Sequence, residues 1–585
     1  MAASRKSRSE KIAPAKPSFW DSGWFPFVAG GLLVLAALAA YHNSFSGPFI
    51  FDDELWITKN PTIRHLWPIW PVLSPPPGLI FQGRPVLNLS LAINYALSGT
   101  GVWGYHALNL AIHITAGLAL FGIVRRTLRR PVMRERFPTG AGLAFAVAAI
   151  WMLHPLQTES VTYVIQRAES LMGMFYLLTV YCFVRGTDSP ASGIWYVLSI
   201  TACLCGMATK EVMVSVPLIV MLYDRTFVAG SFREAWRQRW RVHLGLAGTW
   251  LELGYLMSGI GGRGAGFGLG ITGWTYALTE CPVVVRYLWL AIWPHPLTLD
   301  YGGDVVKSVA EAAPYALILV VLVAGTVIAL WRWPIWGFAG AWVFGILAAT
   351  SSFVPVAFQP MAEHRMYLPL AAVVAMMVLG IYAGLGRRSV VVYLALVIGF
   401  GLLTACRNED YRSELAIWSD TVAKRPRNPR AQYYLGMTLA GTGRLEEALG
   451  HFQEATRLKV DYAEAYNNIG TCLILLNRSA EAVGPYEQAL VYKTEYPEAD
   501  FNLGIAMFNL GRFDEAVQHY QEAVRLQPDY VDARLNLAVA WEKVGRTAEA
   551  IGQYTEVLRI DPSSTVAHDS LARLQAGQPA ANAGR

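Results

Sequence analysis

The feature that most constrains the fold of this chain is a succession of long apolar runs that stops close to residue 405. A helix needs about twenty mostly apolar residues to cross a bilayer. Of the 585 residues, 54% are hydrophobic and 15% are charged, a composition too apolar for an ordinary soluble protein. After the last run, the composition changes to that of soluble helices. The sequence therefore predicts an all-α chain with a polytopic membrane part followed by a globular part.

Eleven apolar runs are predicted to span the membrane within a domain covering 24–405, and the distribution of Lys and Arg sets their orientation. The N-terminal tail (1–23) and the basic loop from Arg125 to Arg136 are expected in the cytoplasm. As a span, the segment 274–293 would disturb this alternation, so we expect it to lie in or dip into the outer face. An odd number of spans places the C-terminal part opposite the N-terminus. The predicted spans are residues 24–42, 105–124, 140–154, 161–184, 193–209, 212–228, 243–259, 313–332, 335–353, 366–385 and 389–405.

A 34-residue period runs through the C-terminal part, from 430 to 565. It is typical of tetratricopeptide repeats, in which each repeat is a pair of antiparallel helices. The sequence therefore predicts four repeats, a helical adaptor at 406–429 that contains Trp418, and a C-terminal tail at 566–585. The repeating columns are Gly436, Gly470, Gly504 with Ala538; Arg444, Arg478, Arg512, Arg546; Glu447, Glu481, Glu515, Glu549; and Phe452, Tyr486, Tyr520, Tyr554.

Three consecutive carboxylates follow the first predicted span, in an outer loop that covers residues 43–104. They are Asp52, Asp53 and Glu54, and they lie among apolar residues such as Phe51 and Trp56. Ionised groups at a membrane boundary are costly unless they are paired or hydrated, and they mark functional sites. This stretch is predicted to be a catalytic acidic site at the outer surface.

Other polar residues of the membrane part gather on the same predicted side. Independent structural roles would scatter them over both faces, so their convergence predicts one cavity that opens outward. Besides the acidic stretch, the set contains Arg84, His106, Asn109, His113, His154, Glu159, Arg167, Glu169, Lys210, Glu211, Glu363, His364, Arg365 and Tyr367.

Structural interpretations compete with these assignments. Polar side chains on spanning helices also fix packing by hydrogen bonding between helices, which suits His106, Asn109 and His113. Glu159 is also placed to cap the following helix. Two ion pairs are further alternatives, one between Lys210 and Glu211 and one between Glu169 and Arg167.

Several motifs occur in a characteristic order along the chain. They are Phe51-Asp52-Asp53, Arg84-Pro85, Tyr105-His106 through His113, His154-Pro155 through Glu159, Arg167-Ala168-Glu169, Lys210-Glu211, and Glu363-His364-Arg365 through Pro369. With the repeat array, this order resembles the transmembrane-and-tetratricopeptide-repeat O-mannosyltransferase family, within the GT-C superfamily of glycosyltransferases. Two positions depart from the family pattern: Glu169 stands where Asp is expected, and His364 stands where Arg or Tyr is frequent.

The resemblance implies a polyprenyl- or dolichyl-phosphate sugar as donor and transfer with inversion. Such a reaction needs a base for the proton of the acceptor hydroxyl and positive charge for the departing phosphate. Asp52 or Asp53 is the predicted base, because adjacent carboxylates raise each other's pKa. The predicted phosphate ligand is Arg365, with His364, Lys210 and Arg84 as weaker candidates.

The expected partners follow from the same resemblance. A solenoid of repeats offers a concave surface, which is expected to hold an acceptor polypeptide or a partner protein, and the family favours a Ser or Thr hydroxyl as acceptor. No cofactor is assigned, and a Mg or Mn ion between Asp53 and Glu169 is left open. The net charge of +6 does not indicate nucleic acid, because Lys and Arg cluster in short loops between spans.

Two other function classes and one other acceptor are consistent with parts of the sequence. A membrane-anchored repeat scaffold would need only one or two spans. A secondary transporter would carry its charges near the bilayer midplane. The sugar acceptor is alternatively a glycolipid or cell-wall polymer. The chain is expected in a bacterial inner membrane with its site and repeats on the periplasmic side, or on the lumenal face of the endoplasmic reticulum in a eukaryote.

Overall fold

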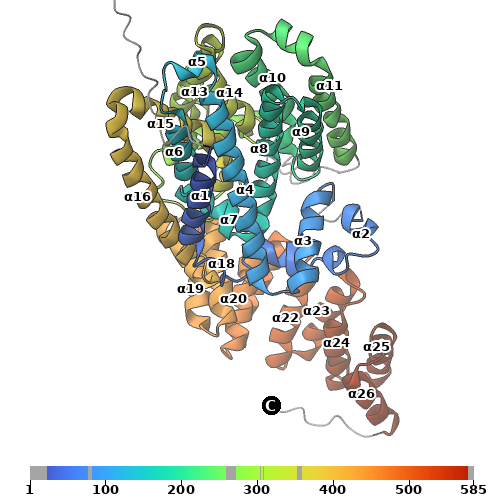
Figure 1. The fold of residues 1–585 in the computed structure, drawn as a ribbon. Helices are drawn as coiled ribbons and strands as arrows, with labels where there is room; N and C mark the ends of the chain where they lie inside the picture. The colour runs from blue at the N-terminus through green and yellow to red at the C-terminus, as the bar shows by residue number, and fades with distance from the viewer. Residues whose placement is uncertain are drawn as a thin grey trace, which may run out of the picture. The chain divides into compact units, whose positions relative to one another are not determined.

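The computed structural model describes residues 23–76, 82–258, 272–303, 305–306, 308–351 and 359–577. The described residues form helices and turns without strands, so the predicted all-α class is confirmed (Figure 1). The chain divides into two compact units. Unit 1 comprises Met1–Leu299 and Gly303–Ser413, and unit 2 comprises Asp300–Gly302 and Glu414–Arg585. The predicted cytoplasmic tail lies almost entirely outside the described residues.

Each of the eleven predicted spans overlaps a helix of unit 1. These helices are α1 (Phe25–Tyr41), α4 (Val102–Leu128), α6 (Gly140–Met152), α8 (Arg167–Asp188), α9 (Ser192–Met207), α10 (Val216–Tyr223), α11 (Phe232–Met257), α13 (Val309–Arg332), α14 (Pro334–Leu347), α15 (Pro369–Leu385) and α16 (Ser389–Asp410). The segment expected at the outer face forms α12 (Gly273–Leu290), which contains Pro282.

Five stretches of the described chain are long and apolar enough to cross a membrane. They are Val102–Leu128, Val164–Asp188, Glu211–Ala229, Val309–Arg332 and Pro369–Asp410, of which the last contains both α15 and α16. The helix pair Gly140–Met152 and Pro155–Thr162, bent by 53°, makes a sixth if it is one span. Unit 1 is therefore the membrane part of a multi-pass protein, while the count of eleven spans stays a prediction.

Helix α4 lies at the centre of unit 1 and packs against α6 and α8 (Figure 1). Small residues permit this close approach: a Cβ at Gly117 would lie 2.2 Å from the sulfur of Met152. At 27 residues, α4 is about 40 Å long, more than the hydrocarbon thickness of a bilayer. One helix therefore connects the two ends of unit 1.

The first outer loop is a folded structure with its own polar core. It contains a π-helical turn, η2 (Glu54–Thr58), a 3₁₀ turn, η3 (Pro61–Ile63), and the helices α2 (Trp70–Leu73) and α3 (Pro85–Ser98). The buried amide of Asn88 donates to the carbonyl oxygen of Val72 at 2.7 Å and to the hydroxyl of Thr62 at 2.9 Å. Because buried polar groups need partners, this network fixes the loop on α3.

Asn408 on α16 binds other elements at the end of unit 1 that carries this loop. Its side-chain amide donates to Ala40 on α1 at 3.0 Å, and its side-chain oxygen accepts a hydrogen bond of 2.7 Å from Thr162. Thr162 ends the short helix α7 (Thr158–Thr162), which follows the 3₁₀ turn η4 (Pro155–Gln157). The first and last helices of unit 1 are thus tied to the segment that carries the second outer motif.

The described residues of unit 2 form ten consecutive helices, arranged mainly as antiparallel pairs. They are α17 (Glu414–Lys424), α18 (Pro429–Gly441), α19 (Leu445–Leu458), α20 (Ala463–Leu475), α21 (Ser479–Tyr492), α22 (Pro497–Asn509), α23 (Phe513–Leu526), α24 (Val531–Lys543), α25 (Thr547–Ile560) and α26 (Thr565–Gln575). Helix α26 occupies the first half of the segment 566–585, for which the sequence predicts a tail. The predicted domain boundaries stay predictions.

The repeating columns of the sequence have a packing explanation in unit 2. A Cβ at Gly470 would lie 2.6 Å from the ring of Tyr486, which is the aromatic residue of the same repeat. Gly436 and Gly504 meet Phe452 and Tyr520 in the same way. The absence of a side chain on the first helix therefore makes room for the aromatic ring of the second.

We expect Gly470→Ala to lower the free energy of unfolding of unit 2 by about 1–3 kcal/mol, because the new methyl group would overlap the buried ring of Tyr486. The matched control is Gly450→Ala on the exposed face of α19, where nothing lies within 4 Å of the added Cβ. This control should instead stabilise by roughly 0.5–1 kcal/mol, because Ala favours helix over Gly. Urea denaturation of the purified protein, followed by far-ultraviolet circular dichroism, measures both changes.

Candidate active site

The acidic stretch of the first outer loop begins with an unusual backbone. Phe51 has a φ of +47°, a conformation that residues with a Cβ rarely adopt. Two residues later, the side chain of Asp53 is fully buried. Such outliers persist where the surrounding structure holds them, and they are frequent at functional sites. The turn at Phe51 therefore directs the Asp53 carboxylate into the protein.

Backbone amides from two distant segments hold the Asp53 carboxylate. One oxygen accepts from Ile50 N at 3.0 Å, and the other accepts from Ile165 N at 2.7 Å. Ile165 lies in the 3₁₀ turn η5 (Val164–Gln166), directly before α8. Burial raises the pKa of Asp53 to about 8, with the negative charge of Asp52 adding to the effect, while the two backbone hydrogen bonds act in the opposite direction.

Asp52 is positioned through its backbone. Its N–H donates to the hydroxyl of Tyr163 at 2.9 Å, and the residue is only partly buried. Glu54, the third predicted carboxylate, behaves differently: its side chain is 63% exposed and forms an ion pair of 3.0 Å with Lys59. The three adjacent carboxylates therefore have three environments, and Glu54 is a surface residue of the π-helical turn.

Glu159 and His364 form a second buried polar pair. The Glu159 carboxylate accepts from the backbone N–H of His364 at 2.8 Å and lies 2.9 Å from its ring Nδ1. Both residues are buried, and Glu159 is thus bound to the loop before α15. Burial, with the positive charge of Lys210 adding to it, lowers the pKa of His364 to about 3. A neutral imidazole donates one hydrogen bond, and the carboxylate of Glu159 accepts it.

The segment between α6 and α8 connects the two clusters, because Ile165 binds Asp53 and Glu159 binds His364. Tyr163, which binds Asp52, lies within electrostatic range of Asp52, Asp53 and Glu159. Glu159 in turn lies within range of Arg365. The first outer loop, the segment between α6 and α8, and the loop before α15 therefore meet at one end of unit 1.

Arg365, the predicted phosphate ligand, is buried in the 3₁₀ turn η8 (Glu363–Met366). Its guanidinium donates to the carbonyl oxygens of Pro360 at 2.6 Å and Gln359 at 2.7 Å. A carboxylate of α12, Glu280, lies 3.6 Å away and supplies the opposite charge. The Glu280 carboxyl is buried, and burial raises its pKa, while the charge of Arg365 and the neighbouring side chains of Tyr276 and Ser351 act in the opposite direction.

The two alternative ion pairs from the sequence are wrong. Lys210 pairs with Glu169, and Glu211 pairs with Arg84 at 3.2 Å. Lys210 has extended backbone angles, so its side chain and that of Glu211 point to opposite sides. Arg167 and Glu169 are two residues apart on α8, and side chains at that spacing do not face each other on a helix.

Arg167 and Asn109 form the core of a packing network. The buried Arg167 guanidinium donates to the Asn109 side chain at 2.6 Å and to the carbonyl oxygen of Tyr105 at 3.0 Å. Asn109 donates to the carbonyl oxygens of Val161 and Val164 at 3.1 and 3.2 Å. These bonds join α4 to the turn that holds Asp53, and they agree with the structural interpretation of Asn109.

The remaining site-supporting residues bind neighbouring elements. His106 Nε2 lies 2.9 Å from the carbonyl oxygen of Gly47, and His113 Nδ1 lies 2.9 Å from the Tyr367 hydroxyl. His154 Nε2 lies 3.2 Å from the carbonyl oxygen of Ala291. The Glu363 carboxylate accepts a hydrogen bond of 2.6 Å from Thr298 N. All of these histidines, Tyr367 and Glu363 are buried. Their contacts fix the helix ends around the candidate site, and whether they also bind substrate stays a prediction.

Two residues of this cluster were not selected from the sequence. Tyr163 lies between the second-outer-loop motifs, and its hydroxyl accepts a hydrogen bond from the backbone N–H of Asp52. Glu280 lies in an apolar helix, and an ionisable residue in such a place signals function by itself, so this signal was available. Among the described residues, no group of three or more His, Cys, Asp or Glu side chains is arranged to hold a metal ion. The Asp53–Glu169 metal hypothesis gains no support from the geometry.

Comparisons with known proteins follow the same division into two units. A family model described as tetratricopeptide repeat matches residues 404–459, 443–500 and 501–565. Human protein O-mannosyl-transferase TMTC1 is 24% identical over 523 residues, which cover 77% of this chain and 57% of the relative. The resemblance to this family is confirmed. Drosophila melanogaster Tmtc3 is 25% identical over 75% of the chain and 56% of its own length.

The similarity to these O-mannosyl-transferases is uneven along the chain. Human TMTC2 reaches 30% identity, but over 201 residues that cover 32% of the chain and 23% of the relative. The chain spans somewhat more than half the length of the first two relatives. Among solved structures, the repeat protein YrrB is 23% identical with a TM-score of 0.26, and the match covers 30% of this chain and 89% of that protein.

We expect the stability of the protein to fall as pH rises from about 4 to about 8, because the raised pKa of Asp53 keeps a proton on the folded chain that the unfolded chain has released. The slope approaches about 1.4 kcal/mol per pH unit if no other group compensates. Asp53→Asn should flatten it. Thermal unfolding in detergent at several pH values between 5 and 8 measures the slope.

The control for this experiment is Asp529→Asn, which alters an exposed carboxylate of unit 2 and should keep the wild-type slope. An Asp53→Asn protein whose unfolding midpoint still falls with pH as in the wild type would show that another group is responsible.

Proposed function

We propose that this chain is an integral-membrane glycosyltransferase that moves a sugar from a polyprenyl-phosphate donor to a Ser or Thr hydroxyl of a protein, with inversion. The relatives are named protein O-mannosyl-transferases, which supports the reaction class. The observation that carries the proposal is the Asp52–Asp53 turn, held by Tyr163 and Ile165 in electrostatic reach of the Glu159–His364 pair. A bacterial inner membrane with the site on the periplasmic side remains our proposed location.

Asp52 is the better of the two candidate bases. Both oxygens of Asp53 accept backbone hydrogen bonds, so this residue positions the turn. Asp52 is partly accessible, so an acceptor hydroxyl can reach it. In the proposed step, the carboxylate of Asp52 takes the hydroxyl proton as the oxygen bonds to the anomeric carbon, and the lipid phosphate departs with the electron pair of the broken C–O bond. Attack from the face opposite the phosphate inverts the anomeric centre.

Arg365 is the proposed phosphate ligand, with Glu280 as its counter-ion before the donor binds. A guanidinium can bind a phosphate through two parallel hydrogen bonds, and its charge stabilises the leaving group. Glu280 lies 3.6 Å from Arg365. When the donor binds, its phosphate would replace the Glu280 carboxylate beside Arg365. The positive charge of Arg365 would then have a negative partner both before and after binding. Lys210, His364 and Arg84 remain secondary candidates, since Lys210 and Arg84 already pair with carboxylates.

The repeats of unit 2 are proposed to bind the acceptor polypeptide or a partner that delivers it. A column of partly buried amides recurs at 34-residue intervals on the first helix of successive repeats: Asn468, Asn502 and Asn536. A side-chain amide both donates and accepts, which suits an extended peptide backbone. Asn468 also donates to the Tyr433 hydroxyl at 3.1 Å, which fixes its orientation.

We expect Asp52→Asn to reduce sugar transfer roughly a hundredfold or more, because the variant keeps the shape of the side chain but cannot take a proton. Transfer from radiolabelled polyprenyl-phosphate sugars to a Ser/Thr-rich peptide, catalysed by the purified protein, measures the rate. The matched control is Glu54→Gln, which alters the exposed neighbour and should retain wild-type transfer.

Equal transfer by the wild type and Asp52→Asn would contradict the assignment of the base. Sugar recovered in a lipid-extractable product instead of the peptide would indicate a glycolipid acceptor. If neither protein transferred sugar while both bound partner proteins, the chain would be a scaffold.

We expect Asn468→Ala with Asn502→Ala to raise the KM for a peptide acceptor about tenfold and to leave kcat unchanged, because two hydrogen bonds to the bound peptide are lost away from the reacting atoms. Asn509→Ala, an exposed amide at the end of α22, is the control. An unchanged KM in the double variant would show that these asparagines do not bind the acceptor peptide.

A further inference from the structure

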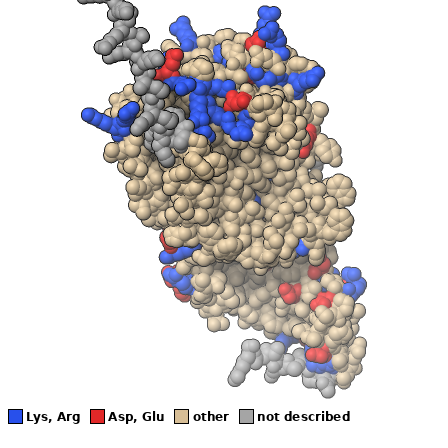
Figure 2. Space-filling model, in the orientation of Figure 1, with Lys and Arg blue, Asp and Glu red and all other residues tan. Residues whose placement is uncertain are grey.

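The end of α4 away from the candidate active site carries a dense arginine cluster. Arg125, Arg126, Arg129 and Arg130 line a hollow of about 310 Å³ together with Pro131 and Asp188. Arg125 follows His106 by nineteen residues of continuous helix, which correspond to about 28 Å. Figure 2 shows that Lys and Arg gather over this end of unit 1, whereas the flank of the helices is largely uncharged. The cluster is therefore separate from the chemistry proposed above.

The positive charge of this cluster is only partly compensated. Asp188 pairs with Arg130 at 2.7 Å and with Arg126 at 3.2 Å. Within the part of the chain that the structure describes, no carboxylate lies within ion-pair distance of Arg125 or Arg129, and the buried Nε of Arg125 has no hydrogen-bond partner. Four guanidinium groups around one carboxylate favour an added anion.

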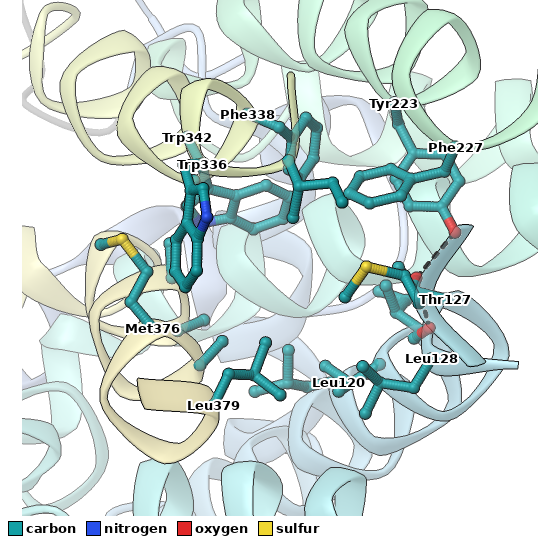
Figure 3. A pocket seen from close by; sticks show the side chains of 18 of the residues that line it. Leu120, Thr127, Leu128, Tyr223, Phe227, Trp336, Phe338, Trp342, Met376 and Leu379 are labelled. Atoms are coloured by element: carbon teal, nitrogen blue, oxygen red, sulfur yellow. Dashed lines mark hydrogen bonds between the residues drawn. The ribbon is translucent and has the colours of Figure 1, made fainter. Parts of the chain in front are cut away.

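An apolar cavity of about 120 Å³ lies beside the cluster, between α4, α10, α14, α15 and the π-helical turn η7 (Asp224–Ala229). Figure 3 shows Leu120, Phe227, Trp342 and Leu379 around this space. The one phenol in the wall, that of Tyr223, is bound to the Thr127 hydroxyl at 2.7 Å. The cavity therefore presents hydrocarbon and aromatic surface to whatever occupies it.

The cavity and the cluster are neighbours. Leu128 lines the apolar cavity and also a third hollow, which Arg129 and Arg134 line. Arg129 in turn lines the arginine hollow. An occupant that reaches from one to the other must be anionic at one end and apolar at the other. A nucleotide or a free anion would leave the apolar cavity empty, whereas a lipid fills both parts.

We propose that this end of unit 1 binds one anionic phospholipid of the surrounding membrane, with its phosphate at Arg125 and Arg129 and an acyl chain in the cavity walled by Phe227, Trp342 and Leu379. Basic pockets between spanning helices are a recurrent site for anionic headgroups. The helices that form the wall include stretches apolar enough to cross a membrane, so an acyl chain enters from the bilayer without crossing water. This lipid site would exist whether or not the chain transfers sugar.

The test is native mass spectrometry of the full chain released from micelles that contain equal amounts of phosphatidylglycerol and phosphatidylcholine. We expect one retained phosphatidylglycerol. Arg125→Gln with Arg129→Gln should weaken its apparent affinity roughly thirtyfold, the loss expected when two guanidinium groups leave the reach of a phosphate. Arg233→Gln with Arg388→Gln removes the same charge from exposed residues outside the cavity and should retain the lipid.

A second variant, Ala375→Phe, fills the cavity while keeping every arginine, and should also lose the lipid. Thermal unfolding of each variant confirms that it is folded. Retention of phosphatidylglycerol by both the arginine and the cavity variants would overturn the proposal, as would equal retention of phosphatidylcholine. Stabilisation by inorganic phosphate alone would reduce the site to an anion site, and selective retention of polyprenyl phosphate would make the occupant the product lipid.

Discussion

A carboxylate that is buried away from water needs hydrogen-bond donors. In this protein, the two donors to Asp53 come from segments that are far apart in the sequence. Ile50 belongs to the loop after α1, whereas Ile165 lies just before α8, 112 residues beyond Asp53. Losing the carboxylate would leave two buried amides without partners. This one side chain thereby fixes the acidic turn of the first outer loop against the segment before α8.

The other polar contacts of the candidate site build on that junction. Tyr163, two residues before Ile165, binds the backbone of Asp52. Arg167, two residues after it, ties the same turn to Asn109 on α4. Glu159 then fixes the loop that bears His364 and Arg365. Three loops that are remote in sequence are thereby held in one place before any substrate arrives, which is the preorganisation that electrostatic catalysis requires.

Much of this arrangement was predictable from the sequence. Long apolar runs and the 34-residue period predict where helices form, because both patterns can be recognised within short stretches of the sequence. Each predicted span overlaps a helix, and Trp418 stacks on Tyr434 at 4.9 Å, where the aromatic column predicts packing. The gathering of polar residues at one end of unit 1 was also predictable. The number of Lys and Arg residues in each loop predicts on which side of the membrane that loop lies, and this places the polar residues together.

The pairing of individual charges was not predictable. Lys210 and Glu211 are adjacent in sequence but lie on opposite sides of an extended backbone, so each finds its partner on another helix or loop. The partner of Glu280 is likewise not apparent from the sequence, because Arg365 lies in a distant loop. A single chain offers several carboxylates to each arginine, and only the tertiary structure selects among them. The same limit applies to Asp52 and Asp53, whose different burial depends on the turn at Phe51.

The length of α4 has a mechanical consequence. Its first turns contact the loop that carries Asp53, through His106 and Asn109, and its last turn supplies the arginine cluster. A rigid rod that pivots near its middle moves its two tips in opposite directions. Any tilt of this helix in response to bilayer thickness or headgroup charge would shift the acidic loop as well. Lipid bound at the arginine cluster thus has a physical route to the geometry of the acidic loop.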